Sequence, residues 1–225
     1  MPQSEIRTLL ASSEASIESP RKTSFGIVIA LVLWLTLVCG ATISLARYAN
    51  TPGNDGPAPA SWPKDSQIPF DSSCPNLVMF VHPHCPCTRA SLGELERLFA
   101  EVSRPSSVQV VFVKPIGTAS DWATTDLWRN ASSIRGVKVW LDNSGKEAER
   151  FRAQTSGQTL LYTHDGELKF QGGITVARGH AGDNPGRTAL RELLQEGHSN
   201  QFKTSVFGCG LFDAQCQKAD VSCKP

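Results

Sequence analysis

The hexapeptide HPHCPC, which begins at His82, holds the most reactive group of side chains in the chain. Two thiols separated by a single residue can exchange with a disulfide, and the thiolate is the form that attacks. Cys85 is the expected nucleophile and Cys87 the expected resolving thiol. His84, when protonated, is expected to favour the Cys85 thiolate. A disulfide between such close neighbours closes a very small ring, so we expect a strained bond and an oxidising couple.

The same hexapeptide also fits a metal site. His82, His84, Cys85 and Cys87 offer imidazoles and thiolates, a soft donor set suited to Cu(I) or Zn. The prolines stiffen the chain, so all of these donors converge only if the turn folds back. The alternative function is a metallochaperone or sensor that works without turnover, whereas the oxidoreductase requires no cofactor. Peroxidase chemistry through a Cys85 sulfenic acid is a third alternative, although its usual threonine-proline context is not visible.

The flanking residues place this motif between a buried strand and a helix. Residues 76–81 (NLVMFV) form a short apolar run typical of a buried strand, and apolar residues at helical spacing follow the motif. Pro86 suits the first helical position, where its missing N–H is not needed, so Cys85 is the predicted N-cap and Cys87 the second helical residue. We expect the free amides and the helix dipole to keep the Cys85 sulfur ionised at an exposed corner.

The rest of the domain alternates predicted strands with predicted helices and ends in a hairpin and a helix. The expected strands are 108–113, 136–141, 159–162 and 168–170, and the expected helices are 121–132, 146–153 and a last helix from the N-cap Asn184 to Gly197. Asp121 is the expected cap of the first of these helices. This order predicts an α/β fold with a mixed sheet flanked by helices.

A strand, a Cys-Pro-containing dithiol, a helix and a later hairpin resemble the thioredoxin-like superfamily. The likeness runs from about residue 76 to residue 197. Three segments, FVHPHCPCTRASLGELERLF, TSGQTLLYTHDGELKFQGGIT and RGHAGDNPGR, look closest to the membrane-anchored thioredoxin-like proteins labelled RedB. The resemblance implies a thioredoxin-like fold and a thiol-disulfide oxidoreductase activity.

Two positions depart from the pattern of that superfamily. Its usual dithiol has two residues between the cysteines, and here Thr88 occupies the place of the second cysteine. A cis-proline normally begins the hairpin strand beside the dithiol, and here Ser156 and Gly157 take that place. The resemblance implies that they bind substrate, because a glycine leaves the backbone free to pair with a substrate strand. It also implies weaker protection of the dithiol against metals.

A glycine-rich loop, residues 172–184, follows the hairpin and is expected to end beside Cys85. Its Arg178 and His180 are candidates to bind a carboxylate or a peptide backbone, or to stabilise the thiolate. The alternative is a solvated insertion that only caps the last helix.

The run from Phe25 to Ala46 carries no charge and, at about 1.5 Å per residue, is long enough for a hydrocarbon core of about 30 Å. It is the predicted transmembrane helix, with a cleaved signal peptide as the alternative. Arg21 and Lys22 lie among the basic residues before it, and Arg47 follows, so we expect a cytoplasmic N-terminus. The domain would then be extracytoplasmic, in the periplasm.

The expected organisation is therefore a cytoplasmic tail (1–24), a transmembrane helix (25–46), a solvated Pro/Gly-rich linker (47–73), a thioredoxin-like domain (74–200) and a Cys-containing tail (201–225). The chain of 225 residues carries almost no net charge, with 22 Lys plus Arg against 21 Asp plus Glu. Nucleic acid is thus not an expected partner. The expected partners are the membrane and protein thiols or disulfides outside the cytoplasm.

Four further cysteines lie on that outer side. Cys74 is about 20 Å of strand away from the motif, too far for a disulfide with Cys85. Cys74 and the tail residues Cys209, Cys216 and Cys223 are candidates for structural disulfides. The alternative is a mobile tail that carries electrons to Cys85.

Overall fold

A computed structural model describes residues 25–212 of the chain. The helix α2 (Phe25–Asn50), which begins the described part of the chain, buries none of its side chains. It is long and apolar enough to cross a membrane. The helix continues past its predicted end at Ala46, and the chain divides into two units between Ser44 and Leu45.

The second unit is built on a five-stranded mixed sheet with the strand order β3-β2-β1-β4-β5. The strands are β1 (Asn76–Val81), β2 (Ser107–Lys114), β3 (Val137–Asn143), β4 (Gln158–Tyr162) and β5 (Leu168–Gly172). β1, β2 and β3 are parallel, β4 is antiparallel to β1, and β5 is antiparallel to β4. This topology, a parallel strand-helix-strand unit joined to a hairpin and a closing helix, confirms the predicted thioredoxin-like α/β fold.

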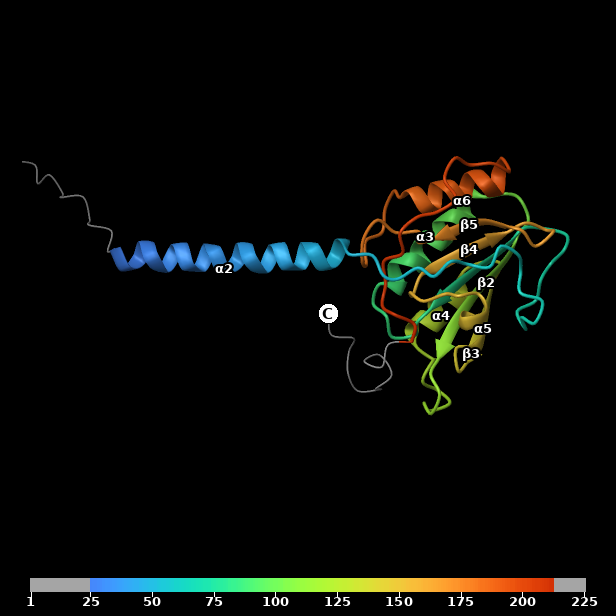
Figure 1. The fold of residues 1–225 in the computed structure, drawn as a ribbon, viewed down its shortest axis with the longest axis horizontal. Coiled ribbons are helices and arrows are strands. Elements are labelled where there is room, and N and C mark those ends of the chain that lie inside the picture. Colours follow the sequence, from blue (N-terminus) through green and yellow to red (C-terminus); the bar gives the residue numbers. More distant parts are fainter. Residues whose placement is uncertain (1–24, 213–225) are drawn as a thin grey trace, which may run out of the picture. The chain divides into compact units, whose positions relative to one another are not determined.

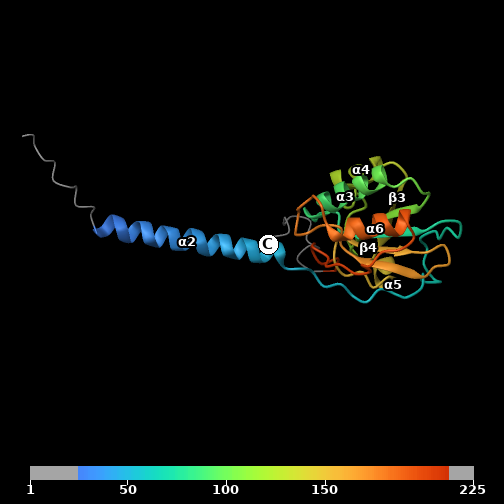
Figure 2. The ribbon, with the colours of Figure 1, turned by 90° about the horizontal axis from the view of Figure 1, so that it is seen from above.

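Helices lie on both faces of this sheet (Figure 1). They are α3 (Thr88–Glu101), α4 (Asp126–Ser133), α5 (Lys146–Arg150) and α6 (Pro185–Gln195). Figure 2 shows α3 and α4 on the side of the sheet opposite to α5. Leu77, Met79 and Val110 point toward α3, α4 and α6 and form one core with them. Val78 and Phe80 alternate with these residues along β1 and belong to a second core on the other face.

Segment 47–73, predicted as a solvated linker, is exposed along most of its length but packs against this second core through a few apolar side chains. The ring centroid of Trp62 lies 4.9 Å from that of Phe151 and 5.3 Å from that of Tyr162. Ile68 is 3% exposed and belongs to the same core. The prediction of a solvated linker therefore fails at these apolar residues, because burying them against the sheet is more favourable than leaving them in water.

Two helix boundaries also differ from the predicted ones. The N-cap of α4 is Thr125, whose hydroxyl accepts a hydrogen bond from Trp128 N at 3.4 Å, whereas the predicted cap Asp121 lies in the preceding turn. α5 ends at Arg150, and the chain then turns through Arg152, which has a φ of 53°. A left-handed residue cannot continue a right-handed helix, so the predicted extension to residue 153 was wrong.

Helix α6 is capped as predicted by Asn184, whose side-chain oxygen accepts a hydrogen bond from Arg187 N at 2.8 Å. We expect Asn184→Ala to lower the free energy of unfolding by about 1 kcal/mol, because the cap satisfies an amide that the helix leaves unpaired. Urea titration of the purified protein checks this as a lower midpoint with an unchanged slope. Asn184→Ser keeps an acceptor and serves as the control. Equal losses in both variants would contradict a capping role.

Candidate active site

The HPHCPC motif lies in the turn that connects the end of β1 to the start of α3. Cys85 N donates a hydrogen bond to His82 O, and Thr88 N donates one to Cys85 O, both at 3.1 Å. The N-cap of α3 is Cys87, with Thr88 as the first helical residue. The prediction of Cys85 as N-cap was therefore wrong by two residues, because Pro86 and Cys87 complete a tight turn before the helix begins.

The predicted exposed corner is instead a buried one. The side chain of Cys85 is 0% exposed and that of Cys87 is 7% exposed. The sulfur of Cys85 contacts a segment from the far C-terminal side of the domain, residues 206–211, which we call the strap. Cys209 N in this strap donates a hydrogen bond to the Cys85 sulfur at 3.4 Å. The prediction of a solvent-exposed nucleophile was wrong because a residue that contacts Cys85 lies 124 positions away in the sequence.

The strap brings a third thiol to the site. The thiols of Cys209 and Cys87 donate hydrogen bonds to the sulfur of Cys85, and the backbone amides of the same two residues add to them. These donors hold the pKa of the Cys85 thiol well below its ordinary range, although burial opposes the shift. The hydrogen bond to Cys85, together with burial, raises the pKa of the Cys87 thiol. These influences favour ionisation of Cys85 within the cluster, and neighbouring thiols rather than the helix dipole are their main source. The role of Cys85 as nucleophile stays a prediction.

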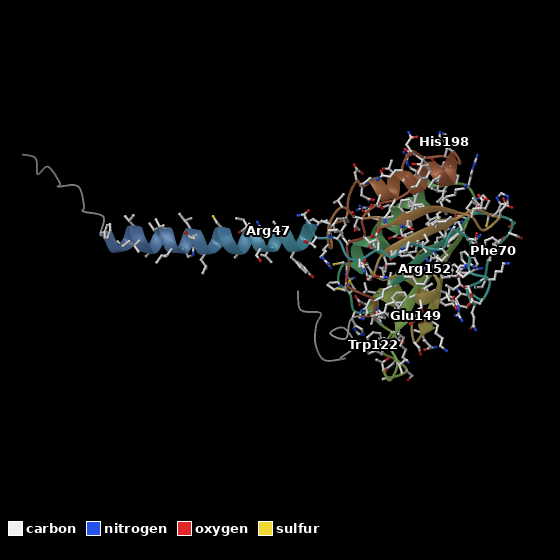
Figure 3. All side chains as sticks on the ribbon, in the orientation of Figure 1. Arg47, Phe70, Trp122, Glu149, Arg152 and His198 are labelled. Carbon is white, nitrogen blue, oxygen red and sulfur yellow. The ribbon has the colours of Figure 1, made fainter. Side chains whose placement is uncertain are left out.

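The histidines of the motif contact Trp122 and each other. His84 is exposed, and its Nε2 lies 3.0 Å from Trp122 O, an acceptor to which only a protonated nitrogen can donate. Its backbone N donates to Nδ1 of the buried His82 at 3.2 Å. The ring centroids of Trp122, labelled in Figure 3, and His84 are 4.6 Å apart. The strongest influences on the Cys85 pKa come from thiols and amides, so a role of His84 in tuning the thiolate stays a prediction.

The metal interpretation requires His82, His84, Cys85 and Cys87 to converge. Within residues 25–212, the structure gathers no group of three or more His, Cys, Asp or Glu side chains that could hold a metal ion. Binding of Cu(I) or Zn by this motif therefore stays a prediction with no ligand set behind it in the described chain.

Ser156 and Gly157 lie directly beside the motif, where the resemblance placed them. The Ser156 hydroxyl accepts a hydrogen bond from His82 N at 2.8 Å and lies 2.8 Å from the Thr88 hydroxyl. Gly157 N donates to Phe80 O at 2.8 Å, and its φ of 91° suits a glycine. The Ser156 hydroxyl therefore joins both ends of the active turn. Sequence reasoning missed this contact, since a serine and a threonine 68 residues apart carry no pairing signal.

The glycine-rich loop brings Arg178 to the dithiol but leaves His180 exposed. The Arg178 guanidinium donates a hydrogen bond to Gly208 O in the strap. It also acts on Cys87, whose pKa it lowers against the stronger opposing effects. Nδ1 of His180 lies 2.9 Å from Arg178 O, within its own loop. Arg178 thus holds the strap over the site, and substrate binding by either residue stays a prediction.

The remaining cysteines occupy separate places. Cys74 precedes β1, at the opposite end of that strand from Cys85, and burial raises the pKa of its thiol. Cys209 lies against Cys85, so a structural bridge between Cys74 and Cys209 is not formed. Among the described cysteines none is in a disulfide. The predicted bridges through Cys216 and Cys223 lie outside the described residues.

Comparison with known proteins finds similar solved structures but no matching family model or curated protein. An uncharacterized conserved protein from Geobacillus kaustophilus is similar in structure, with a TM-score of 0.49 and 16% identity over 72% of this chain and 92% of that chain. StoA from Bacillus subtilis gives a TM-score of 0.39 with 15% identity, covering 64% of this chain and 97% of that chain.

A secreted Mycobacterium tuberculosis disulfide oxidoreductase, described as homologous to E. coli DsbE, is a further similar structure. Its TM-score is 0.35 with 17% identity, over 44% of this chain and 68% of that chain. At such identities and TM-scores, the likeness transfers no activity or site residue to this chain. Particular closeness to RedB-type proteins also stays a prediction.

Proposed function

We propose that this protein is a thiol-disulfide oxidoreductase of the thioredoxin-like superfamily with Cys85 as its nucleophile. The observation that carries the proposal concerns the Cys85 sulfur, which lies at the turn between β1 and α3. It receives hydrogen bonds from two thiols and from the backbone N–H groups of the same two residues, Cys87 in this turn and Cys209 in the strap. Such donors stabilise a thiolate, the form of cysteine that attacks a disulfide. The substrate class is protein thiols and disulfides.

The reaction conserves electrons between protein and substrate. The Cys85 thiolate attacks one sulfur of a substrate disulfide, forms a mixed disulfide and releases the other sulfur as a thiolate, which takes up a proton from water. A second thiol of the protein then attacks Cys85, releases the remaining substrate thiol and leaves an internal disulfide. The substrate gains two electrons, and the same steps in reverse donate a disulfide to a dithiol.

Membrane attachment through α2 is part of the proposal. The length and apolar composition of Phe25–Asn50 support a single span. The basic residues Arg7, Arg21 and Lys22 before the helix support a cytoplasmic N-terminus and an extracytoplasmic domain. Thiol chemistry on that side would meet substrates in a compartment where disulfides persist.

Exchange with glutathione disulfide tests the proposed nucleophile. Reduced full-length protein in detergent is mixed with glutathione disulfide, quenched with acid and digested under non-reducing conditions. We expect Cys85 to carry the first mixed disulfide, and we expect Cys85→Ser to abolish release of reduced glutathione. Cys74→Ser, which removes a thiol at the far end of β1, is the matched control and should react as the unmodified protein does. Undiminished exchange in Cys85→Ser would falsify the proposal.

A further inference from the structure

The strap pairs through its backbone with residues 154–156, just before β4. Cys209 O accepts a hydrogen bond from Ser156 N, and Leu211 N donates to Gln154 O, both at 2.8 Å. Thr155 and Gly210 form an antiparallel bridge between these contacts. The backbone just before β4 is therefore already paired, and its partner is the chain's own C-terminal side.

The strap is fixed at both ends and close-fitting in the middle. Val206 and Leu211 are each 1% exposed, and Val206 O accepts a hydrogen bond from Gly53 N at 2.8 Å. A side-chain carbon added at Gly208 would lie 2.0 Å from Ser156 O. Figure 1 shows this red segment running beside the start of the segment that follows α2. Glycine thus allows the strap to press its backbone against Ser156 and deliver the next residue, Cys209, to the dithiol.

Cys209 is within bonding reach of the nucleophile. Its backbone N is 3.4 Å from the Cys85 sulfur, and its thiol hydrogen-bonds to that sulfur. The N and Sγ atoms of one cysteine are joined only through Cα and Cβ, so rotation about χ1 moves the Cys209 sulfur around the position that its amide already holds near Cys85. A disulfide needs that kind of close approach between the two residues.

We propose that Cys209 is the resolving thiol of this site, and that the strap is an internal substrate mimic which leaves to admit a disulfide and returns to displace it. The proposal rests on the thiol-disulfide oxidoreductase function proposed above. It assigns the second thiol of that reaction to a residue 124 positions away from Cys85 rather than to its neighbour Cys87.

The space beside the strap shows where a substrate would enter. A pocket of about 520 Å³ borders the strap and is lined in part by Thr155, Gly208 and Gly210. Figure 3 labels two more of its lining residues, Glu149 and Arg152. Two of the lining glycines belong to the strap itself, so departure of the strap would open the pocket toward Cys85. A peptide entering there would find Ser156 N and Gln154 O free to pair.

The exchange balances without a further reactant. With the strap displaced, the Cys85 thiolate attacks a peptide disulfide, forms a mixed disulfide and releases one peptide thiolate. As the strap returns, the Cys209 thiol loses its proton to solvent, and its sulfur attacks the Cys85 sulfur. The bond from Cys85 to the peptide breaks, the second peptide thiolate leaves and takes up a proton, and a Cys85–Cys209 disulfide remains. The peptide disulfide is the oxidant, and it is reduced by two electrons.

Cys87 has a different part in this scheme. In the reduced protein the Cys87 thiol donates a hydrogen bond to the Cys85 sulfur. This hydrogen bond, together with burial, raises the pKa of Cys87, so Cys87 keeps its proton. A disulfide across Cys-Pro-Cys would close a small, strained ring, so Cys87 is poorly placed to attack Cys85. Cys87 is therefore a positioning residue that holds the Cys85 sulfur ionised.

Trapping of the mixed disulfide distinguishes Cys209 from Cys87. Reduced full-length protein in detergent is mixed with glutathione disulfide, quenched at successive times and mapped under non-reducing conditions. The unmodified protein should form a Cys85–Cys209 disulfide. In Cys209→Ser the glutathione adduct on Cys85 should last about tenfold longer or more, because a tethered thiol acts at an effective concentration on the order of millimolar. Cys216→Ser, from the same tail, is the control and should resolve normally.

Each outcome has one meaning. A Cys85–Cys87 disulfide in the unmodified protein, or an adduct on Cys209→Ser that resolves at the unmodified rate, overturns the assignment of Cys209 and leaves the oxidoreductase function standing. No Cys85 adduct in any variant overturns the oxidoreductase function itself. Mapping of the unmodified protein needs no substitution, so the assignment is tested even if Cys209→Ser folds poorly.

Discussion

The reduced protein is expected to carry one thiolate, on Cys85, down to about pH 5. An ordinary cysteine has a pKa of about 8.5, so at pH 5 fewer than about one such thiol in a thousand is ionised. The thiols of Cys209 and Cys87, with backbone N–H groups, lower the pKa of Cys85 far below that range. Ultraviolet absorbance of the thiolate near 240 nm, followed during acid titration, measures the ionised fraction.

The matched variants for this titration are Cys85→Ser and Cys74→Ser. Cys85→Ser should remove the acid-stable absorbance, whereas Cys74→Ser should keep it, because burial raises rather than lowers the pKa of Cys74. Cys209→Ala, which removes this donor, should move the titration of Cys85 toward higher pH, since the hydrogen bond from the Cys209 thiol is the largest cause of the shift. An unmodified protein whose thiolate absorbance disappears above pH 7 would contradict the geometry described for the cluster.

The same shift has a consequence for stability. A folded-state pKa below the unfolded value gives stability that is complete above the unfolded pKa and is lost as pH falls toward the folded one. Between about pH 5 and pH 8 the unfolded chain holds a proton on Cys85 that the folded chain does not. The free energy of unfolding should therefore rise by about 1.4 kcal/mol per pH unit more in the unmodified protein than in Cys85→Ser. Parallel pH dependences in the two would rule out a buried thiolate.

The sequence predicts best those parts of the fold that neighbouring residues decide. The apolar run at 76–81 coincides with β1, and the Asn184-Pro185 pair begins α6 where the capping rules place it. The α4 boundary was wrong because Asp121 and Thr125 are both acceptable caps by type, and only the observed bond to Trp128 N selects the second. Local sequence thus gives the elements but leaves the choice between equivalent caps open.

The part of the site that the sequence did not predict depends on distant contacts. The strap sequence VFGCGL has neither a clear strand nor a helix period, and its glycines resemble a loop. Its position is set by pairing with Thr155 and by burial of Val206 and Leu211, none of which is visible from the residues near Cys85. A mobile tail that carries electrons to Cys85 was one alternative from the sequence. The spacing of the tail cysteines does not indicate which of them reaches Cys85.

Opening of the strap should control access of reagents to Cys85. The side chain is 0% exposed, so iodoacetamide can reach it only when the strap moves away. Gly208→Ala places a Cβ 2.0 Å from Ser156 O, where backbone on both sides must shift. We expect alkylation of Cys85 in this variant to be faster by about tenfold or more, which corresponds to about 1.4 kcal/mol less for opening. Digestion and mass spectrometry of the alkylated full-length protein give the rate at Cys85.

Gly93→Ala in α3 is the matched control, because a Cβ there meets nothing within 4 Å. It adds the same methyl group and should leave alkylation of Cys85 unchanged. Loosening the strap also removes hydrogen bonds from the Cys85 sulfur and thereby raises its pKa, which would slow alkylation at neutral pH. Rates taken at about pH 9.5, where ordinary thiols are ionised, isolate access from ionisation. If Gly208→Ala and Gly93→Ala then react alike, the strap does not limit entry to the site, and a displaceable substrate mimic is excluded.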